Sequence, residues 1–228
     1  MTNPWIRLPN KAPFILLEDQ EVIEAFNKKR SGKKTEIMLD QLPSPYVGDP
    51  KAPVVILNLN PAYAKESARE SSFSLYEKIA RANFEHIFSD YPFYPLNPDL
   101  KDVSAAGHDW WSKACLGDLI PESRLNFEKF SEKIFCVEFL PYHSERNGWK
   151  GSVLPSQKYA IALVEAAVDR GALIIIMWGN RNKRTWFEAV PTLASANVIT
   201  LRNPQCKKIS KGNLNEGAFE KIIKHLQI

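Results

Sequence analysis

Short apolar segments of this sequence are each followed by side chains that can bind or orient a ligand. Asn58 and Asn60 end the first such segment, Glu138 lies within the second, and His143 follows it. An amide donates and accepts hydrogen bonds, a carboxylate only accepts them, and histidine exchanges a proton near neutral pH. The segment ends therefore supply the groups from which a hydrolytic or ligand-binding site is built.

The segments that carry these residues have the pattern of buried parallel strands. Each has five to seven residues, is rich in β-branched or aromatic types, and is nearly continuous rather than alternating. The expected strands are residues 54–59, 134–140, 173–177 and 197–201. In open α/β sheets, ligands bind beyond the carboxyl ends of the strands. We therefore expect the site where these four segments end.

Helical patterns fall before, between and after the strands. They cover residues 17–28, 73–88, 155–170, 182–190 and 217–227. This alternation predicts one three-layer α/β/α domain over residues 1–228, with a central four-stranded, mainly parallel sheet. Residues 1–45 are expected to form an N-terminal helical extension. Residues 89–107 and 141–155 are expected to be long loops, which often carry function.

Composition narrows the class of protein. The chain has 228 residues, of which 44% are apolar and 25% charged, as in globular proteins. Apolar runs are too short to span a membrane, and the first residues lack the basic-then-apolar order of a secretory signal. The three cysteines, Cys115, Cys136 and Cys206, are too few and too scattered for a disulfide framework, a zinc site or an iron–sulfur cluster. We expect a cytoplasmic protein without a metal.

Positive charge is concentrated in one part of the chain. The net charge is +4, from 30 basic and 26 acidic residues. Residues 178–211 hold seven basic side chains and one acidic side chain, a local net charge of +6. Such a cluster is either a solvated surface or the contact surface for an anionic partner. Candidate phosphate-binding residues within it are Arg181, Lys207, Lys208 and Lys211.

Four stretches of the sequence together resemble the uracil-DNA glycosylase superfamily. Residues 48–61 resemble its first motif, a strand that ends in a turn with Asp or Asn before Pro, and Phe73-Ser74 lies at the family's spacing after it. Residues 178–181, Trp-Gly-Asn-Arg, resemble the Trp-Gly that follows the family's third strand. Residues 203–213 resemble the last motif, a His-Pro loop that approaches the scissile bond and enters the minor groove.

The resemblance implies a fold, a partner and a reaction. The fold is a four-stranded parallel sheet between helices. The partner is double- or single-stranded DNA from which a base is flipped out, and the reaction is cleavage of its N-glycosidic bond, as in base-excision DNA repair, without a metal or organic cofactor. Asn60 falls at the water-positioning residue and Phe73 at the aromatic that stacks on the base. Asn58 and Tyr63 are neighbouring candidates for base contacts.

The sequence also departs from the family pattern. Asn203 stands where many members carry His, and we consider His143 as a substitute that assists the leaving base. Glu138 stands at the strand position where uracil-specific members use Asn. An ionised Glu only accepts hydrogen bonds, so it favours an amino-bearing or modified base over uracil.

Each candidate also has a structural explanation. Asn60 can be a turn residue, Phe73 a core residue and His143 a surface residue. Glu138 can pair with Arg or Lys near the end of the sheet.

Two other functions stay open. One is a catalytically weak or inactive relative that binds DNA or a nucleotide, suggested by Asn60 and Asn203 together. The other is an unrelated small-molecule α/β enzyme, although the sequence has no glycine-rich phosphate loop, nucleophile elbow or His-Glu-x-x-His motif.

Overall fold

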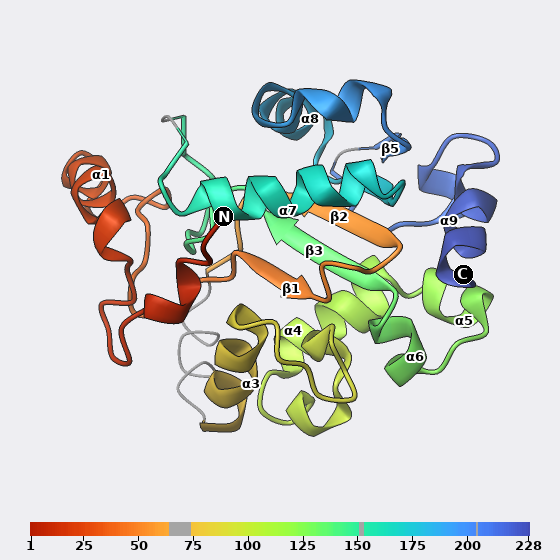
Figure 1. Cartoon of the computed structure of the whole chain (residues 1–228), viewed down its shortest axis with the longest axis horizontal. Coiled ribbons are helices and arrows are strands. Elements are labelled where there is room, and N and C mark those ends of the chain that lie inside the picture. The colour runs from red at the N-terminus through yellow and green to blue at the C-terminus, as the bar shows by residue number, and fades with distance from the viewer. Residues whose placement is uncertain (64–73, 151–152, 204) are drawn as a thin grey trace.

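A computed structural model of the protein describes residues 1–63, 74–150, 153–203 and 205–228, with the backbone alone at 179–181. Its centre is a five-stranded sheet in the order β1-β3-β2-β4-β5. Figure 1 labels β1, β2, β3 and β5 of this sheet. The strands are β1 (Tyr46–Gly48), β2 (Val54–Asn58), β3 (Ile134–Glu138), β4 (Leu173–Ile176) and β5 (Val198–Thr200). Strands β2 to β5 run parallel, and β1 pairs antiparallel with β3. The predicted α/β fold with a mainly parallel sheet is confirmed, with one strand more than expected.

Helices cover both faces of the sheet, as a three-layer arrangement requires (Figure 1). One face carries α7 (Gln157–Asp169) and α8 (Gly179–Ala189), and the other carries α3 (Ser74–Phe84), α4 (Ala105–Asp109) and α6 (Phe127–Ser131). The other α-helices are α1 (Leu17–Lys28), α5 (Leu119–Ser123) and α9 (Ala218–Leu226). Every residue of β2, β3 and β4 is buried. Burial on both faces explains why these strands have continuous apolar sequences.

The predicted helices and the observed ones agree where the helices are long. Helix α1 has the predicted bounds, and α7, α8 and α9 differ from the predictions by at most three residues at either end. The segment 105–131, for which no helix was predicted, holds α4, α5, α6 and a π-helix, η4 (Trp110–Cys115). Helices of five or six residues complete fewer than two turns, so no 3.6-residue periodicity develops in their sequence.

Strand β1 was not predicted, because its three residues are too few for a strand pattern. Its position depends on Gly48, whose φ of 100° lies in the left-handed region that side chains avoid. A Cβ atom there would also clash with the carbonyl oxygen of Ile134 on β3. Gly48 therefore lets β1 approach the edge of the sheet closely.

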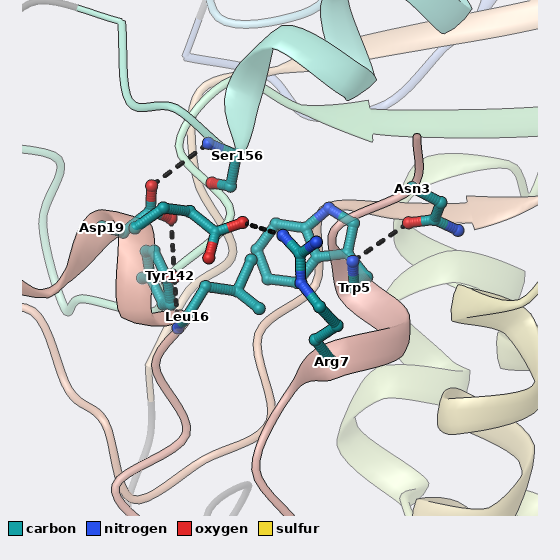
Figure 2. Close-up of polar contacts among 8 residues, drawn as sticks. Asn3, Trp5, Arg7, Leu16, Asp19, Tyr142 and Ser156 are labelled. Carbon is teal, nitrogen blue, oxygen red and sulfur yellow. Dashed lines mark hydrogen bonds and ion pairs between the residues drawn. The ribbon is translucent and has the colours of Figure 1, made fainter. Parts of the chain in front are cut away.

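Residues 1–45 pack into the core instead of extending from it. Trp5 is 1% exposed and its ring lies against Phe84 and Tyr142. Figure 2 shows the polar contacts of this region: Asp19 of α1 accepts hydrogen bonds from the Tyr142 hydroxyl (2.8 Å) and from the Ser156 backbone N–H (3.1 Å). The N-terminal segment thereby holds the chain that follows β3, where the candidate site residue His143 lies.

Candidate functional site

A cavity of about 580 Å³ lies where β2 and β3 end. One side is formed by residues at the ends of these strands and of β4, and the other by α3, α4, η4 and the turns between α3 and α4. Predicted site residues that line it are Asn58, Asn60, Glu138 and His143, together with Trp178 of the resemblance. The cavity therefore joins residues far apart in the sequence, such as Asn58 and Trp178, which are 120 positions apart, as expected for the carboxyl edge of a parallel sheet.

Asn58 connects the two strands at the floor of this cavity. It is directly opposite Glu138 in the β2–β3 register. Its Nδ2 donates to Glu138 Oε1 (3.0 Å), and its Oδ1 accepts from the indole N–H of Trp178 (3.2 Å). Trp178 adopts a left-handed φ of 63°, which is unusual for a bulky residue and is often found at functional sites. The three side chains form one hydrogen-bonded row that holds the carboxyl group in place.

Glu138 is 8% exposed, and burial raises the pKa of its carboxyl to about 8, an effect that the Asn58 hydrogen bond partly offsets. At neutral pH the protonated form therefore predominates. Its Oε2 has no hydrogen-bond partner among the described residues, and no described Arg or Lys forms an ion pair with it. The ion-pair explanation of Glu138 is thus not supported. A neutral carboxyl can also donate, which changes the argument for an amino-bearing base.

Asn60 is half-buried on the loop after β2. Its Nδ2 donates to the Pro61 carbonyl oxygen and to Ser144 Oγ, both at 3.0 Å. These contacts hold the amide nitrogen, and they leave Oδ1 with no protein partner among the described residues. An amide oxygen at the cavity wall can accept a hydrogen bond from a water molecule or a ligand. The geometry is compatible with both the water-positioning role and the turn role.

His143 is buried, and both of its ring nitrogens face backbone carbonyl oxygens. Nδ1 lies 2.8 Å from Ala62 O, and Nε2 lies 2.9 Å from Leu42 O. Burial lowers the pKa of the imidazole, against the opposing effect of these two carbonyls. His143 is therefore not a surface residue, and it has no free nitrogen for a leaving base. Its contacts instead hold together the loops before β1, after β2 and after β3.

Three other predicted residues do not join this group. Asn203 is exposed and accepts a hydrogen bond from the Gln205 N–H (3.0 Å) within its own turn, and it does not line the cavity. Tyr63 directs its hydroxyl to Asp40 Oδ2 (3.0 Å). Phe73 lies outside the described residues. The geometry therefore gives no support to the leaving-group role of Asn203.

The predicted phosphate-binding cations are partly neutralised by acidic residues from other segments. Lys208 lies 2.6 Å from Asp118, and Lys211 lies 3.3 Å from Glu220. Lys207 is exposed and forms no ion pair with the described acids. The side chain of Arg181 lies outside the described part of the chain. The local excess of charge is therefore smaller than the sequence suggests.

Several cavity residues were not predicted from the sequence. They are Gln41 before β1, Glu145 after β3, and the aromatic residues Tyr76, Tyr94, Trp110 and Trp111. The adjacent tryptophans at 110 and 111 could have indicated this part of the site in the sequence, because tryptophan is enriched at binding surfaces. The π-helix that presents them had no recognisable sequence pattern.

Among the described residues, no cluster of three or more His, Cys, Asp or Glu side chains has the arrangement of a metal site. No described helix is both long and apolar enough to cross a membrane.

Comparisons of the chain with protein-family models, with curated proteins and with solved structures found no match. The likeness to the uracil-DNA glycosylase superfamily accordingly stands on the residues described above.

Proposed function

We propose that the protein is a DNA glycosylase-like hydrolase that holds a flipped base in this cavity and cleaves its N-glycosidic bond. The observation that carries the proposal is the convergence of Asn58, Asn60 and Glu138 on one cavity at the carboxyl ends of β2 and β3. Flipping exposes C1′ of the sugar at a cost of a few kcal/mol, which contacts to the base recover. The proposal includes a cytoplasmic location, which the three free cysteines support.

Asn60 orients the attacking water in this mechanism. The C1′–N bond breaks with its electron pair going to the base, and positive charge develops at C1′. The water oxygen then bonds to C1′, and the proton that it releases ends on the departed base. Asn60 Oδ1 accepts a hydrogen bond from this water but removes no proton, because an amide does not titrate. We expect slower turnover than with a carboxylate at this position.

Glu138 contacts the edge of the base through its free Oε2. The neutral carboxyl donates to a base carbonyl, as in uracil, whereas the ionised form accepts from an amino group, as in cytosine. With a pKa of about 8, the neutral form favours carbonyl-bearing bases at pH 7. The preference for amino-bearing bases expected from the sequence is therefore confined to alkaline pH.

Variants at Asn60 test the mechanism. Asn60→Ala should reduce base release from oligonucleotides ~10²-fold or more, the scale of losing one preorganised polar contact. Asn60→Asp should preserve or raise activity above about pH 5, where an ordinary Asp is ionised. DNA affinity should change only a few-fold in both variants, because phosphate contacts lie elsewhere.

Asn126→Ala is the matched control, because Asn126 caps α6 through the Lys129 N–H (2.8 Å) and does not line the cavity. It should cost about 1 kcal/mol of stability and leave base release unchanged. Folded Asn60→Ala protein with wild-type base release would remove Asn60 from the mechanism.

A DNA- or nucleotide-binding module is the second candidate. It is favoured by the occupied ring nitrogens of His143 and by the position of Asn203 away from the cavity. Strand cleavage by alkali after incubation with substrate DNA detects base loss and separates an enzyme from this module. DNA binding without any alkali-sensitive site would favour the module.

A further inference from the structure

The cavity is larger than a single base needs, and its two sides differ in chemistry. Its volume of about 580 Å³ falls within the ~300–1,000 Å³ of pockets that enclose drug-sized ligands. The side formed by strand ends and the loops after them carries polar side chains, among them Asn58, Asn60 and Glu138, beside apolar residues such as Leu59 and Pro61. The opposite side is formed by helices and turns. It includes the polar residues Ser104 and His108, but most of its large side chains are apolar or aromatic: Tyr76, Tyr94, Pro95, Leu100, Trp110 and Trp111. A base that fills the polar side leaves the aromatic side available.

The polar side holds two buried oxygen atoms that lack a partner among the described residues. They are Oε2 of Glu138 and Oε1 of Gln41, a residue 5% exposed. An unpartnered buried polar group destabilises the folded protein, so a bound group that supplies a partner is favoured. Gln41 is also held in place, because the carbonyl of the next residue, Leu42, contacts His143 Nε2 at 2.9 Å. The cavity lining thus holds two buried groups that a ligand can satisfy by hydrogen bonding.

The aromatic side is also fixed before any ligand binds. Trp110 and Trp111 pack edge to face with ring centres 4.4 Å apart, and Trp111 packs on buried Phe93 in the same manner at 4.8 Å. Tyr94 packs against Tyr76 with ring centres 5.9 Å apart. Both tryptophans belong to the π-helix η4, a type of helix that frequently occurs at functional sites. Such a wall favours a flat apolar group, which stacks on or packs against ring faces.

We propose that the cavity takes a two-part ligand: a nucleobase whose polar edge meets Gln41 and Glu138 and which carries a large flat apolar substituent against Tyr94, Trp110 and Trp111. This inference rests on the proposed function and specifies its substrate class, bases that bear a bulky aryl-type modification. The substituent, rather than the base alone, accounts for most of the difference in affinity between modified and unmodified bases.

Binding of free bases to the full chain tests this without requiring DNA or catalysis. Cytosine, N4-benzylcytosine and deoxycytidine are titrated at about pH 7 and followed by ligand-observed NMR. All three offer a ring carbonyl oxygen to which the neutral Glu138 carboxyl can donate at this pH, and an N4–H from which Gln41 Oε1 can accept. The benzyl compound should bind about tenfold or more tightly than cytosine, the scale of one aromatic stacking contact. Deoxycytidine should gain less than threefold, because its sugar is not flat and apolar.

Two variants assign the contacts. Trp110→Ala should remove most of the benzyl advantage and leave cytosine affinity within about twofold. Gln41→Ala should weaken both bases by a similar factor of about five to ten, the range for a neutral hydrogen bond. The matched control is Phe187→Ala, a half-buried aromatic residue of α8 that does not line the cavity. It should change neither affinity.

The outcomes separate this inference from the proposed function. Equal affinity for cytosine and its benzyl derivative overturns the two-part ligand and leaves base binding intact. So does a benzyl advantage that persists in folded Trp110→Ala, or an equal gain with deoxycytidine. Absence of binding for every base to folded wild-type protein overturns both proposals. The comparison of cytosine with its benzyl derivative uses wild-type protein, so it does not depend on the folding of any variant.

Discussion

The Glu138 carboxyl is buried beside Asn58, and its removal from solvent raises its pKa to about 8. Glu138 lines the cavity, and its Oε2 has no hydrogen-bond partner among the described residues. In the proposed mechanism the same group therefore determines which edge of a base is accepted and how the site responds to pH. Asn58 contributes by fixing the other oxygen, so that Oε2 alone is offered to a ligand.

The raised pKa of Glu138 predicts how stability depends on pH. The folded pKa of about 8 exceeds the ordinary value of 4.5, so the favourable contribution of this group is complete below about pH 4.5 and is lost as pH rises through about 8. The free energy of unfolding of wild-type protein should fall over this range. Glu138→Gln should lessen the fall, because the amide stays neutral. Urea denaturation at about pH 5, 7 and 9 measures both.

Glu165→Gln is the control for that experiment, because Glu165 is an exposed residue of α7. It should keep the wild-type dependence on pH. Parallel curves for wild-type and Glu138→Gln protein would show that the Glu138 carboxyl ionises without cost, and the neutral-carboxyl account of base recognition would then be wrong.

At the scale of elements, helix α1 holds the loop that follows β3. Asp19 is 0% exposed, accepts hydrogen bonds from Tyr142 and Ser156, and has its pKa raised by burial. His143 and Ser144, which follow Tyr142 directly, then contact the loops before β1 and after β2. The side chains of the cavity wall thus depend on contacts between elements more than 100 residues apart.

Removal of the Asp19 carboxyl should be costly. Asp19→Ala leaves the Tyr142 hydroxyl and the Ser156 N–H buried without an acceptor, and it should lower the free energy of unfolding by about 2–4 kcal/mol. The stability losses of the single variants Asp19→Ala and Tyr142→Phe should sum to about 1 kcal/mol more than the loss measured for the double variant. Denaturant unfolding of the four proteins measures this coupling.

Glu21→Ala serves as the control on the same helix, because Glu21 is exposed and its loss should stay within about 0.5 kcal/mol. Additive losses at Asp19 and Tyr142 would mean that the α1 contact does not hold the loop after β3.

At the scale of the whole molecule, the positive charge available to the proposed partner, DNA, depends on which cations lack an acidic neighbour. Lys208 and Lys211 are paired with Asp118 and Glu220, which lie 90 and nine positions away in the sequence. Surface pairs of this kind are worth only about 0–1 kcal/mol, so a phosphate can displace the acid. DNA affinity should therefore be moderate, sensitive to salt and adjustable through the acidic partners.

Charge variants test this account of DNA binding. Lys207→Glu should weaken binding to all sequences alike, and it should reduce the slope of log affinity against log salt by ~1 for each phosphate that the protein ceases to neutralise. Asp118→Asn should strengthen binding, because it releases Lys208. Electrophoretic or anisotropy titrations at about 50 and 200 mM salt measure both changes. Unchanged affinity in both variants would assign this region to an ordinary solvated surface.

The sequence alone predicted the parts of the fold that local patterns encode. The continuous apolar runs at 54–59 and 134–140 predicted the central strands, because strands buried on both faces have no polar alternation. The long helices followed from their 3.6-residue spacing. The rule that ligands bind beyond strand ends directed attention to Asn58, Asn60 and Glu138, which the structure places around one cavity.

Only the tertiary structure decided what those side chains can do. The pKa of Glu138 depends on burial and on Asn58, 80 residues away, and the ring of His143 depends on carbonyls at positions 42 and 62. The ion pair of Lys208 depends on Asp118, and the aromatic wall depends on a π-helix too short to leave a periodic pattern. Sequence spacing records periodicity along the chain, whereas desolvation and hydrogen bonding depend on neighbours that meet only when the chain folds.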